Sequence, residues 1–589
     1  MEMKVADVIV KCLEAEGIEY AFGITGYHYL ALYKALKDSS IKYISVKHEN
    51  AASLSALQYA RIAQKPALIM GTAGPGATNL ITGICEMYKS NLPGFIITPI
   101  PPTNIQGKNA SQEDSGIGNS YSISGIMTHI TKKSITCSNP QNIPDNIRDL
   151  FRISLHGRKG PVHLLVPVNF FEQKINYDHL LPGQYRCTND TAVDFNAIKN
   201  IALELKKCKK PLLLIGHRAW FPNISDSIKK FSNDYGIPVI LSGGAKGLYD
   251  EFSPYFGGIL DIYGHRSAEV LVKNSDLIIS MGEDFGETTV NKYEPDLFGD
   301  KLIQIDMDGY DIGRNYPVRY CACGNLGSYL YYLNEEIKSL NIPKYYDESF
   351  RSIFEKENLS LTQEMNDDSV PLKPQRILNE ISRLAPHNCF FIVDMGRIGL
   401  FTMRSLKVHS NSYSLSLGNY TMAQAVGGSI GGKAALPDSI VSVICGDGAF
   451  LMHGMELATA QQYKLPLIWF VFNDQMYGSV EWAQRLLYDD LGFCTELFVP
   501  DLSKFAEAFS IDYYKIFDIA TLQSSLAAAF NKYSSQSKSA LIEIVFDHDE
   551  QLPLKPMMVK FIQEICNLQN FKTTPYFMKS FKRMLREKV

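Results

Sequence analysis

Two polar residues stand at the ends of consecutive apolar runs near residue 450 and could together hold a cation. Asp447 follows the run "SIVSVIC" within a Gly-Asp-Gly turn, and Asn473 follows the run "PLIWFVF". Continuous apolar runs of this length are typical of strands buried on both faces of a parallel sheet, where ligands bind beyond the carboxyl ends. Carboxylate and amide oxygens suit Mg²⁺, which usually also binds phosphate oxygens. The pattern alone is equally compatible with a magnesium and phosphate site and with two unrelated polar turns.

A second candidate lies in the first hundred residues, where Glu49 ends an expected strand and begins an alanine-rich helical stretch. A glutamate in this position is usually a group that stabilises the helix N-terminus. The next strand ends in "GTAGPGATN", a glycine-rich turn from Gly71 to Asn79. The turn has the character of an anion cradle, but it lacks the Lys-Ser/Thr of a P-loop and gives weak support for nucleotide binding.

Parallel sheets are needed to position these residues, and the sequence predicts three of them. Apolar runs of strand length alternate with helical stretches in three series, with a connector of partly helical character near 340–370. We therefore expect an α/β fold of three doubly wound parallel-sheet domains. The expected strands are "YAFGIT", "KYISVK", "PALIMGTA", "GFIITPI" and "GPVHLLVPV", then "PLLLIG", "IPVILSGG", "SDLIISMG" and "KLIQIDMD", then "NCFFIVDMG", "SIVSVICGDG", "PLIWFVFND" and "ALIEIVFDH". The expected domains are 1–185, 190–345 and 370–560, followed by a basic, amphipathic helical extension at 561–589.

The composition is that of an ordinary globular protein and excludes several function classes. The chain has 589 residues, of which 46% are hydrophobic and 20% charged, with a net charge of −4. We expect no nucleic acid and no membrane among its partners, because no basic excess is present. The 11 cysteines lack Cys-x-x-Cys spacing, so we expect reduced thiols and a cytoplasmic location. The acidic, helical N-terminal stretch is unlike a signal peptide.

The joint order of these motifs resembles that of the thiamine-diphosphate enzymes, especially their acetolactate-synthase-like branch. The resemblance is carried by "HEN" at Glu49, "GTAGPGATNL", "GPVHLLVPV", the Gly-Asp-Gly turn and Asn473, over nearly the whole chain. It implies a pyrimidine-binding, a central and a diphosphate-binding domain, in that order. It also implies thiamine diphosphate and Mg²⁺ as cofactors, and a homodimer or homotetramer with active sites at the subunit interface.

The resemblance assigns the metal ligands and the activating acid. Asp447 and Asn473 match Mg²⁺ ligands, and the backbone carbonyl of Gln475 matches the third. Asp474 departs from the second asparagine that is usual in the family. Glu49 matches the glutamate that bonds the pyrimidine ring and drives it into its imino form, which makes Glu49 the expected catalytic group.

Other residues are expected to hold the cofactor rings and diphosphate. Met422 matches the apolar residue wedged between the two rings, with core packing as the alternative. The Tyr420 carbonyl falls where a backbone oxygen accepts from the amino group, at a position that is glycine in most members. Arg397 and Ile398 replace a Gln-His pair common in acetolactate synthases. The remaining expected contacts are Gly74, Asn79, Gly396, Gly446, Gly448, Ala449, Met476, Tyr477 and Gly478.

The substrate pocket departs from that of acetolactate synthases. Tyr27 and His28 replace small residues, and both are expected catalytic-site residues. His28 could donate a proton to a carbonyl oxygen or could be a packed surface histidine. Gln112 matches an active-site glutamine, whereas Ser111 replaces a phenylalanine.

The acceptor side of the expected pocket comprises Ser479, Trp482 and Thr288. Trp482 matches a tryptophan with which acetolactate synthases select the acceptor, with a buried helix aromatic as the alternative. Thr288 stands in place of an arginine that clamps the acceptor carboxylate. Without a bidentate guanidinium, acidic acceptors are disfavoured.

From these observations we predict a carboligase that decarboxylates a 2-oxo acid, with pyruvate as the first candidate. The acyl-anion equivalent would pass to a carbonyl or activated acceptor. One alternative is a 2-oxo-acid decarboxylase, for which His28 is the clear proton-donor candidate. Another is a non-catalytic cofactor-binding subunit, which the intact Glu49, Asp447 and Asn473 argue against. The flavin (FAD) that acetolactate synthases bind in the central domain is doubtful, because its contacting positions are not recognisable.

Overall fold

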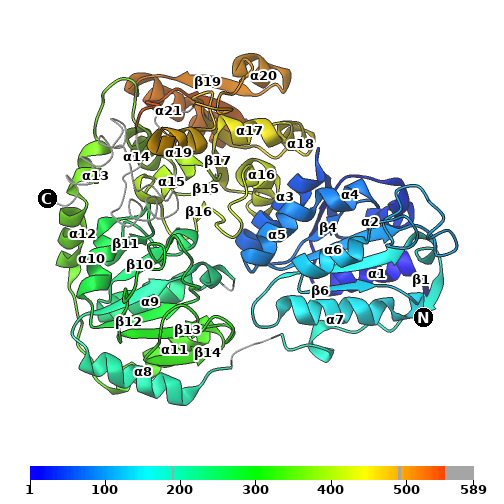
Figure 1. The fold of residues 1–589 in the computed structure, drawn as a ribbon, viewed down its shortest axis with the longest axis horizontal. Helices are drawn as coiled ribbons and strands as arrows, with labels where there is room; N and C mark the ends of the chain where they lie inside the picture. The colour runs from blue at the N-terminus through cyan, green and yellow to red at the C-terminus, as the bar shows by residue number, and fades with distance from the viewer. Residues whose placement is uncertain (189–191, 222, 489–491, 551–589) are drawn as a thin grey trace. The chain divides into compact units, whose positions relative to one another are not determined.

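The structure is a computed structural model that describes residues 1–188, 192–221, 223–488 and 492–550. The helical extension predicted at 561–589 lies outside these residues. Three six-stranded sheets are present, and every strand pair within them is parallel, as the α/β prediction requires (Figure 1). The chain packs into two compact units: unit 1 comprises 1–190, 416–438 and 453–466, and unit 2 comprises 191–415, 439–452 and 467–589.

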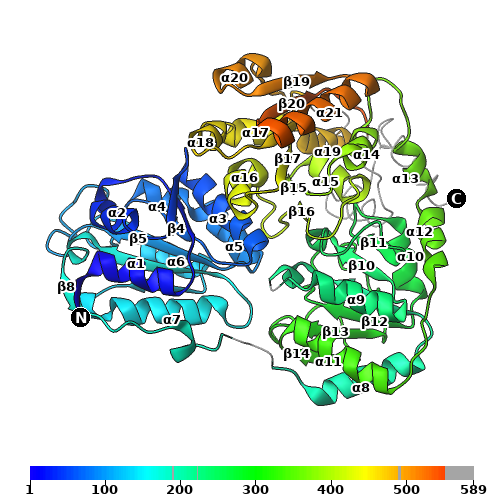
Figure 2. The ribbon, with the colours of Figure 1, turned by 180° about the vertical axis from the view of Figure 1, so that it is seen from behind.

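The first sheet belongs to unit 1 and has helices on both faces. Helices α1, α2 and α7 share one apolar core with it, and α1 and α7 can be followed on the same face in Figure 2. Helices α3 and α5 contact the strands as well. In sheet order the strands are β3 (Lys42–Ser45), β2 (Tyr20–Gly23), β4 (Leu68–Met70), β5 (Gly94–Ile100), β7 (Pro161–Pro167) and β6 (Lys133–Thr136). The helices are α1 (Val5–Ala15), α2 (Leu30–Lys37), α3 (Glu49–Ala63), α5 (Ile81–Lys89) and α7 (Ile143–Leu155).

Helix α16 (Gln424–Ala435) also belongs to unit 1, where it lies along α3. The "GGSIGG" stretch permits this close approach, since a Cβ at Gly431 would stand 1.8 Å from the carbonyl oxygen of Ser55. Ser55 Oγ donates to the carbonyl of Gly427 at 2.9 Å. The glycines of this stretch therefore serve helix packing.

The central sheet lies in unit 2 between two apolar layers. Helices α8, α9 and α11 form the core on one face, and α10 forms the core on the other. The strand order places a switch in winding direction between β9 and β12, which is where ligands bind in doubly wound sheets. The strands are β11 (Phe256–Leu260), β10 (Val239–Ser242), β9 (Pro211–Ile215), β12 (Leu277–Met281), β13 (Leu302–Asp306) and β14 (Tyr320–Cys323). The helices are α8 (Phe195–Lys207), α9 (Ser225–Tyr235), α10 (Arg266–Asn274) and α11 (Leu326–Ser339).

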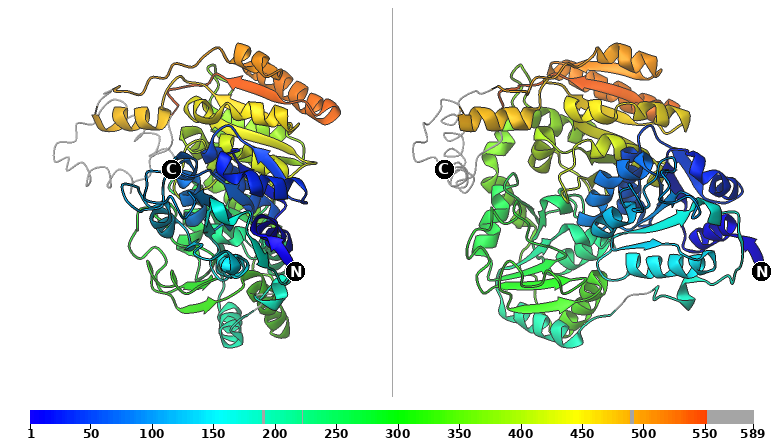
Figure 3. Two further views of the ribbon diagram at one scale, coloured as in Figure 1. Left: turned by 90° about the vertical axis from the view of Figure 1, so that its right-hand side faces the viewer. Right: turned by 45° about the vertical axis from the view of Figure 1, so that its right-hand side comes forward.

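The third sheet also lies in unit 2, and Figure 3 shows its strands in two further views, coloured from yellow-green to orange-red. The connector before it carries the short helices α12 (Arg351–Glu357) and α13 (Leu359–Glu364), as its sequence indicates. The strands are β16 (Tyr413–Ser414), β15 (Cys389–Val393), β17 (Ile440–Gly446), β18 (Ile468–Phe472), β20 (Ala540–Ile544) and β19 (Asp512–Ile516). The helices are α14 (Pro374–Leu384), α15 (Arg397–Ser405), α17 (Asp447–His453), α19 (Gly478–Tyr488), α20 (Leu502–Ala508) and α21 (Ile519–Gln536).

Every strand expected from the sequence is present, and the strands of the three sheets that were not expected all lie at sheet edges. These are β6, β11, β14, β16 and β19. An edge strand is paired on one side only and can carry polar residues, so it lacks the continuous apolar run of an interior strand. A small antiparallel pair of β1 (Glu2–Lys4) and β8 (Lys174–Asn176) was also not expected.

Candidate active site

Strands β17 and β18 end side by side and bring two of the predicted polar turns together in unit 2. Gly446 is paired with Phe472 at the last position of the two strands, so Asp447 and Asn473 follow neighbouring strand ends. The same turns, with the start of α17, carry the other cofactor contacts predicted for this edge, which are Gly448, Ala449, Met476, Tyr477 and Gly478.

The Asp447 carboxyl group is nearly inaccessible to solvent and only partly satisfied. Its residue is 2% exposed, and Oδ1 accepts a hydrogen bond from the Gly448 N–H at 2.7 Å. Oδ2 is buried and has no hydrogen-bond partner among the residues that the structure describes. Burial raises the Asp447 pKa to about 7, with a smaller contribution from the charge of Asp474. Nearby backbone N–H groups act in the opposite direction and lower the pKa. A divalent cation here would remove the cost of burying the charged carboxylate.

The oxygens predicted as the second and third metal ligands are engaged elsewhere. Asn473 Nδ2 donates to Glu543 Oε1 at 2.9 Å, and its Oδ1 accepts from the Gln475 N–H at 3.3 Å. The Gln475 carbonyl accepts from the Leu497 N–H at 2.7 Å. Asp474 is instead the residue whose charge acts on Asp447. The sequence reasoning treated Asp474 as a mild departure, although an acid directly after a strand end was the available signal.

A buried arginine lies beside this pair of acids at the start of α15. Arg397 is 4% exposed, and its Nη2 donates to the carbonyl of His548 at 2.6 Å and lies 4.0 Å from Asp474 Oδ2. Its Nε and Nη1 atoms are buried without a partner among the described residues. Gly396 precedes it with φ 141° and open space at its Cβ position, and Ile398 follows it within the helix. A guanidinium with spare donors beside a helix N-terminus is suited to a phosphate group.

His548 links two acids of this edge. Its Nδ1 lies 3.4 Å from Asp474 Oδ2, and its Nε2 lies 3.5 Å from Glu481 Oε1. These two acceptors raise its pKa to about 9, so the imidazole is positively charged at neutral pH. His548 was not predicted from the sequence, because it lies 74 residues after Asp474 in the chain.

The predicted acceptor residues lie on two different parts of unit 2. Ser479 and Trp482 are on α19, where Ser479 is exposed and Trp482 is 9% exposed with a buried Nε1 that lacks a partner in the described residues. Thr288 lies in the loop after β12, and its carbonyl accepts from the Ile262 N–H at 2.9 Å. The residue is half-buried and carries no charge that could clamp a carboxylate.

In unit 1, Glu49 is the first residue of α3 and meets Asn79. The helix is capped by His48, whose Nδ1 accepts from the Asn50 N–H at 3.1 Å. The Glu49 carboxylate accepts from Asn79 Nδ2 at 3.0 Å and is half-buried. Because His48 supplies the side-chain cap, Glu49 remains available for a bound group.

The glycine-rich turn of unit 1 is held by an acid that sequence reasoning missed. The Gly74 N–H donates to Asp114 Oδ2 at 2.8 Å, and Asp114 is fully buried. Burial raises the Asp114 pKa to about 6. Gln112 packs against this turn, since a Cβ at Gly74 would lie 3.1 Å from Gln112 Cβ, while Gln112 and Ser111 are exposed. The acidic "SQEDSG" stretch contained the only available signal for Asp114.

The pair Tyr27 and His28 begins a short 3-10 turn in unit 1. Tyr27 is 82% exposed, and His28 Nδ1 lies 3.1 Å from Thr72 Oγ1. Burial lowers the His28 pKa below its usual value, so the imidazole is neutral at neutral pH. Tyr420 and Met422 lie in the segment before α16, where Tyr420 is exposed and Met422 is half-buried.

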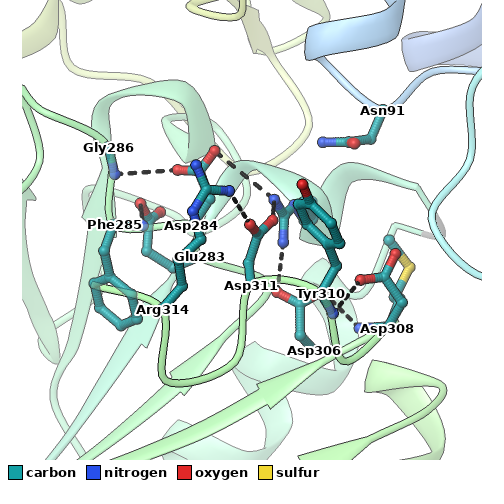
Figure 4. Close-up of polar contacts among 12 residues, drawn as sticks. Asn91, Glu283, Asp284, Phe285, Gly286, Asp306, Asp308, Tyr310, Asp311 and Arg314 are labelled. Atoms are coloured by element: carbon teal, nitrogen blue, oxygen red, sulfur yellow. Dashed lines mark hydrogen bonds and ion pairs between the residues drawn. The ribbon is translucent and has the colours of Figure 1, made fainter. Parts of the chain in front are cut away.

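An internal ion-pair cluster lies at the carboxyl ends of β9, β12 and β13 in the central sheet (Figure 4). Arg218 follows β9, is 3% exposed, donates from Nη1 to Asp306 Oδ2 at 2.9 Å and pairs through Nη2 with Asp311. Asp284 lies 3.8 Å from Arg218 Nη2, and Arg314 pairs with Asp311. The terminal nitrogens of the buried arginine are thus already held by carboxylates.

Glu283 is a further acid at these strand ends. It is 1% exposed, and its Oε2 is buried without a hydrogen-bond partner among the described residues. Burial and the nearby Asp284 raise its pKa to about 8. A flavin dinucleotide with its diphosphate at this place would meet carboxylates whose buried arginine is already paired.

Several wider features bear on the class of protein. Across the parts that the structure describes, no helix combines the length and apolar character that crossing a bilayer requires. In these parts, no three His, Cys, Asp or Glu side chains lie close enough together to hold a metal ion. A cation at Asp447 would therefore also need oxygens from other groups.

Comparisons with known proteins match all three parts of the chain. Residues 3–119 match the N-terminal TPP-binding domain of thiamine pyrophosphate enzymes, 198–333 their central domain and 394–544 their C-terminal TPP-binding domain.

The chain is also similar to acetolactate synthase subunits over nearly its full length. It is 30% identical over 574 residues to a probable acetolactate synthase large subunit of Methanocaldococcus jannaschii, covering 94% of each chain. It is 30% identical over 566 residues to the acetolactate synthase large subunit of Haemophilus influenzae, covering 94% of this chain and 96% of the relative. A probable large subunit of Methanococcus aeolicus is 28% identical over 587 residues, with 96% of each chain covered.

Proposed function

Because the chain belongs to the thiamine pyrophosphate enzymes, in the branch of the acetolactate synthase large subunits, we propose that it is a Mg²⁺-dependent carboligase. As a member it is a thiamine-diphosphate-dependent enzyme that forms or cleaves C–C bonds. Its donor substrate would be a 2-oxo acid, with pyruvate as the first candidate, and its acceptor an uncharged carbonyl or activated acyl compound. We further propose a homodimer or homotetramer with active sites at the subunit interface.

The orphaned Oδ2 of the buried Asp447 carries this proposal. It lies at the end of β17, where the charge of Asp474 acts on it, and Arg397 beside the same edge has two buried nitrogens without partners in the described parts of the chain. Thiamine diphosphate with Mg²⁺ would satisfy both, because the metal binds the carboxylates and the diphosphate accepts from the guanidinium.

The hydrogen bonds at this edge support a metal ligand set different from the one that the sequence suggested. We propose Asp447 and Asp474 as the side-chain ligands. Asn473 Oδ1 already accepts from the Gln475 N–H, and the Gln475 carbonyl already accepts from the Leu497 N–H. Two carboxylates also balance a divalent cation better than one carboxylate and one amide.

The bound cofactor would supply the acyl-anion chemistry, and the residues of this chain would bind, orient and move protons. We propose that the Glu49 carboxylate hydrogen-bonds the pyrimidine ring, with Asn79 Nδ2 orienting it. Arg397 would hold the diphosphate, and Met422 and Tyr420 would contact the rings. No step uses a flavin.

The state of His28 supports ligation over simple decarboxylation. A decarboxylase must protonate the carbanion equivalent before an acceptor reacts with it, which requires a well-placed acid. His28 has a lowered pKa because it is partly buried, and it is neutral at neutral pH. A neutral imidazole is a much weaker proton donor than imidazolium.

The proposal can be tested by product analysis of the purified full-length protein supplied with thiamine diphosphate and Mg²⁺. Pyruvate should be given alone and with a panel of aldehydes and ketones, and the products should be identified by mass spectrometry. We expect a new C–C bond with at least one uncharged acceptor and little acetolactate from pyruvate alone. Acetaldehyde as the only product with every acceptor would overturn the carboligase proposal in favour of a decarboxylase.

A further inference from the structure

Glu86 of α5 is fully buried, and its carboxylate accepts hydrogen bonds from the backbone of a loop in unit 1 that is distant in the sequence. The loop comprises residues 416–421, here called the Glu86 loop, and lies more than 300 positions further along the chain. The donors to its two oxygens are the hydroxyls of Ser90 (3.2 Å) and Ser416 (2.5 Å) and the N–H groups of Gly418 (3.0 Å), Asn419 (3.0 Å) and Thr421 (3.3 Å).

The backbone of the Glu86 loop has a conformation that its residue types rarely adopt. Tyr420 has φ 53°, and Ala423, two residues after the loop, has φ 68°, so two residues with side chains lie in the left-handed region. Such conformations persist when surrounding contacts over-determine them. The Glu86 carboxylate holds the backbone on both sides of Tyr420, because it accepts from the N–H groups of Asn419 and Thr421.

Tight packing around the carboxylate leaves little freedom for the loop to shift. A Cβ at Gly418 would stand 2.8 Å from Glu86 Oε1 and 2.7 Å from Ser90 Oγ, so glycine is needed there. At its start the loop is tied to α16, because Gln424 Nε2 donates to the Ser416 carbonyl at 2.7 Å and Gln424 Oε1 accepts from the Ser416 N–H at 3.2 Å.

We propose that Glu86 is a positioning residue for the thiamine cofactor, acting through the Glu86 loop. The loop leads directly into the two residues assigned to the cofactor rings, the Tyr420 carbonyl and the Met422 side chain. By holding the backbone on either side of Tyr420, Glu86 sets the direction of that carbonyl before the cofactor arrives. This inference rests on the proposed function, because it takes the cofactor contacts of Tyr420 and Met422 from it.

The hydrogen-bonding groups around Glu86 explain why a carboxylate is found at this position. All five surrounding groups are donors, and an ionised carboxylate is an acceptor through both oxygens. An amide of the same shape would turn an NH₂ group toward some of these donors and leave them unsatisfied. The substitution Glu86→Gln therefore keeps the volume of the side chain and breaks part of the network.

The test compares Glu86→Gln with Glu456→Gln in the full-length protein. Glu456 is a matched control, because it is 1% exposed in the same unit and accepts from the Lys47 N–H at 2.9 Å and the Thr459 hydroxyl at 2.6 Å. Thermal unfolding, amide hydrogen exchange of the Glu86 loop without cofactor, and the Kd for thiamine diphosphate with Mg²⁺ are measured for each.

We expect Glu86→Gln to speed exchange of the Glu86 loop amides and to weaken thiamine diphosphate binding by roughly tenfold or more. Glu456→Gln should cost similar thermal stability and leave the Kd unchanged, and Glu86→Asp should restore part of the affinity. If Glu86→Gln does not fold, Ser416→Ala removes a single donor and should shift exchange and Kd in the same direction.

Wild-type affinity in a Glu86→Gln variant with faster loop exchange would overturn the inference. Equal loss of affinity in both glutamine variants would also overturn it, because the effect would then follow stability alone. Failure of the wild-type protein to bind thiamine diphosphate is a separate result that rejects the proposed function itself, and this inference with it.

Discussion

The imidazole of His548 stands against the carboxylate of Asp474, with Nδ1 3.4 Å from Oδ2. Asp474 is the acid that replaces the asparagine usual in the resembling enzymes, and His548 is positively charged at neutral pH because its pKa is raised to about 9. Arg397, another departure, lies 4.0 Å from the same oxygen. The second acid at this edge is therefore accompanied by two cationic groups.

Asp474→Ala should lose most of its Mg²⁺-dependent affinity for thiamine diphosphate. Removing one of two facing carboxylates leaves the diphosphate charge less compensated, and we expect a loss of roughly a hundredfold. Asn473→Ala, which removes a side chain bound to Glu543, should lose much less. Calorimetric titration with thiamine diphosphate at several Mg²⁺ concentrations decides between them. The opposite ranking of the two variants would restore Asn473 as the ligand.

Glu49→Gln should reduce turnover by at least about a hundredfold while thiamine diphosphate still binds, since an amide cannot share a proton with the pyrimidine ring. The decisive measurement is the exchange rate of the cofactor C2 proton, followed by NMR. Asp145→Asn, at an exposed side chain of the same unit (80% accessible), is the control and should behave as wild type. An exchange rate equal to wild type in Glu49→Gln would remove Glu49 from the catalytic role.

The stability of the protein should depend on pH through Glu283. Its folded-state pKa is raised to about 8 by burial and by Asp284, above the usual 4.5. Between these values the folded state keeps a proton that the unfolded state releases, so this contribution is fully present below about pH 4.5 and is lost as the pH rises through about 8. The slope is at most about 1.4 kcal/mol per pH unit.

We expect the unfolding temperature of the wild-type protein to fall between pH 5 and pH 8. In Glu283→Gln this fall should be smaller, and the variant should be more stable than wild type near pH 8. The difference between the two curves isolates this group from other titrating residues. Asp300→Asn, at a side chain that is 98% accessible, is the control and should run parallel to wild type. Parallel curves for Glu283→Gln would show that Glu283 is ionised in the folded state.

The interior of the fold could be predicted from the sequence because a strand buried on both faces must be apolar throughout. The run before Asp447 has this property, and so both the strand and the acid at its end were identified. Edge strands such as β19, "DYYKI", carry polar residues toward solvent and give no such signal. Most strands found from the sequence are thus buried interior strands, and the edge strand β3, which is only partly buried, is the exception.

The site was predictable where a residue follows a strand directly, and less so where the backbone turns. Asn473 and Asp474 both follow β18, and choosing between them requires the turn at Gln475, where φ is 56°. Glu86 could not be found from sequence for a different reason. Its partners in the Glu86 loop lie more than 320 positions away, and only the packing of α5 beside that loop brings them together.

The last prediction concerns the acceptor, where Thr288 stands in place of the arginine that clamps a carboxylate in acetolactate synthases. Thr288→Arg should raise acetolactate formation from pyruvate alone, since a charged hydrogen bond contributes roughly 1.5–3 kcal/mol, or about ten- to a hundredfold in acceptor use. Thr288 is half-buried and its carbonyl is held by the Ile262 N–H, so the backbone should keep its place when the side chain changes. Tyr331→Arg adds the same single charge at a site of the same unit that is 61% exposed and should leave the product ratio unchanged. The ratio of acetolactate to the product with an uncharged aldehyde is the quantity to measure. Efficient acetolactate formation by the wild-type protein would show that another group of the pocket already binds the acceptor carboxylate.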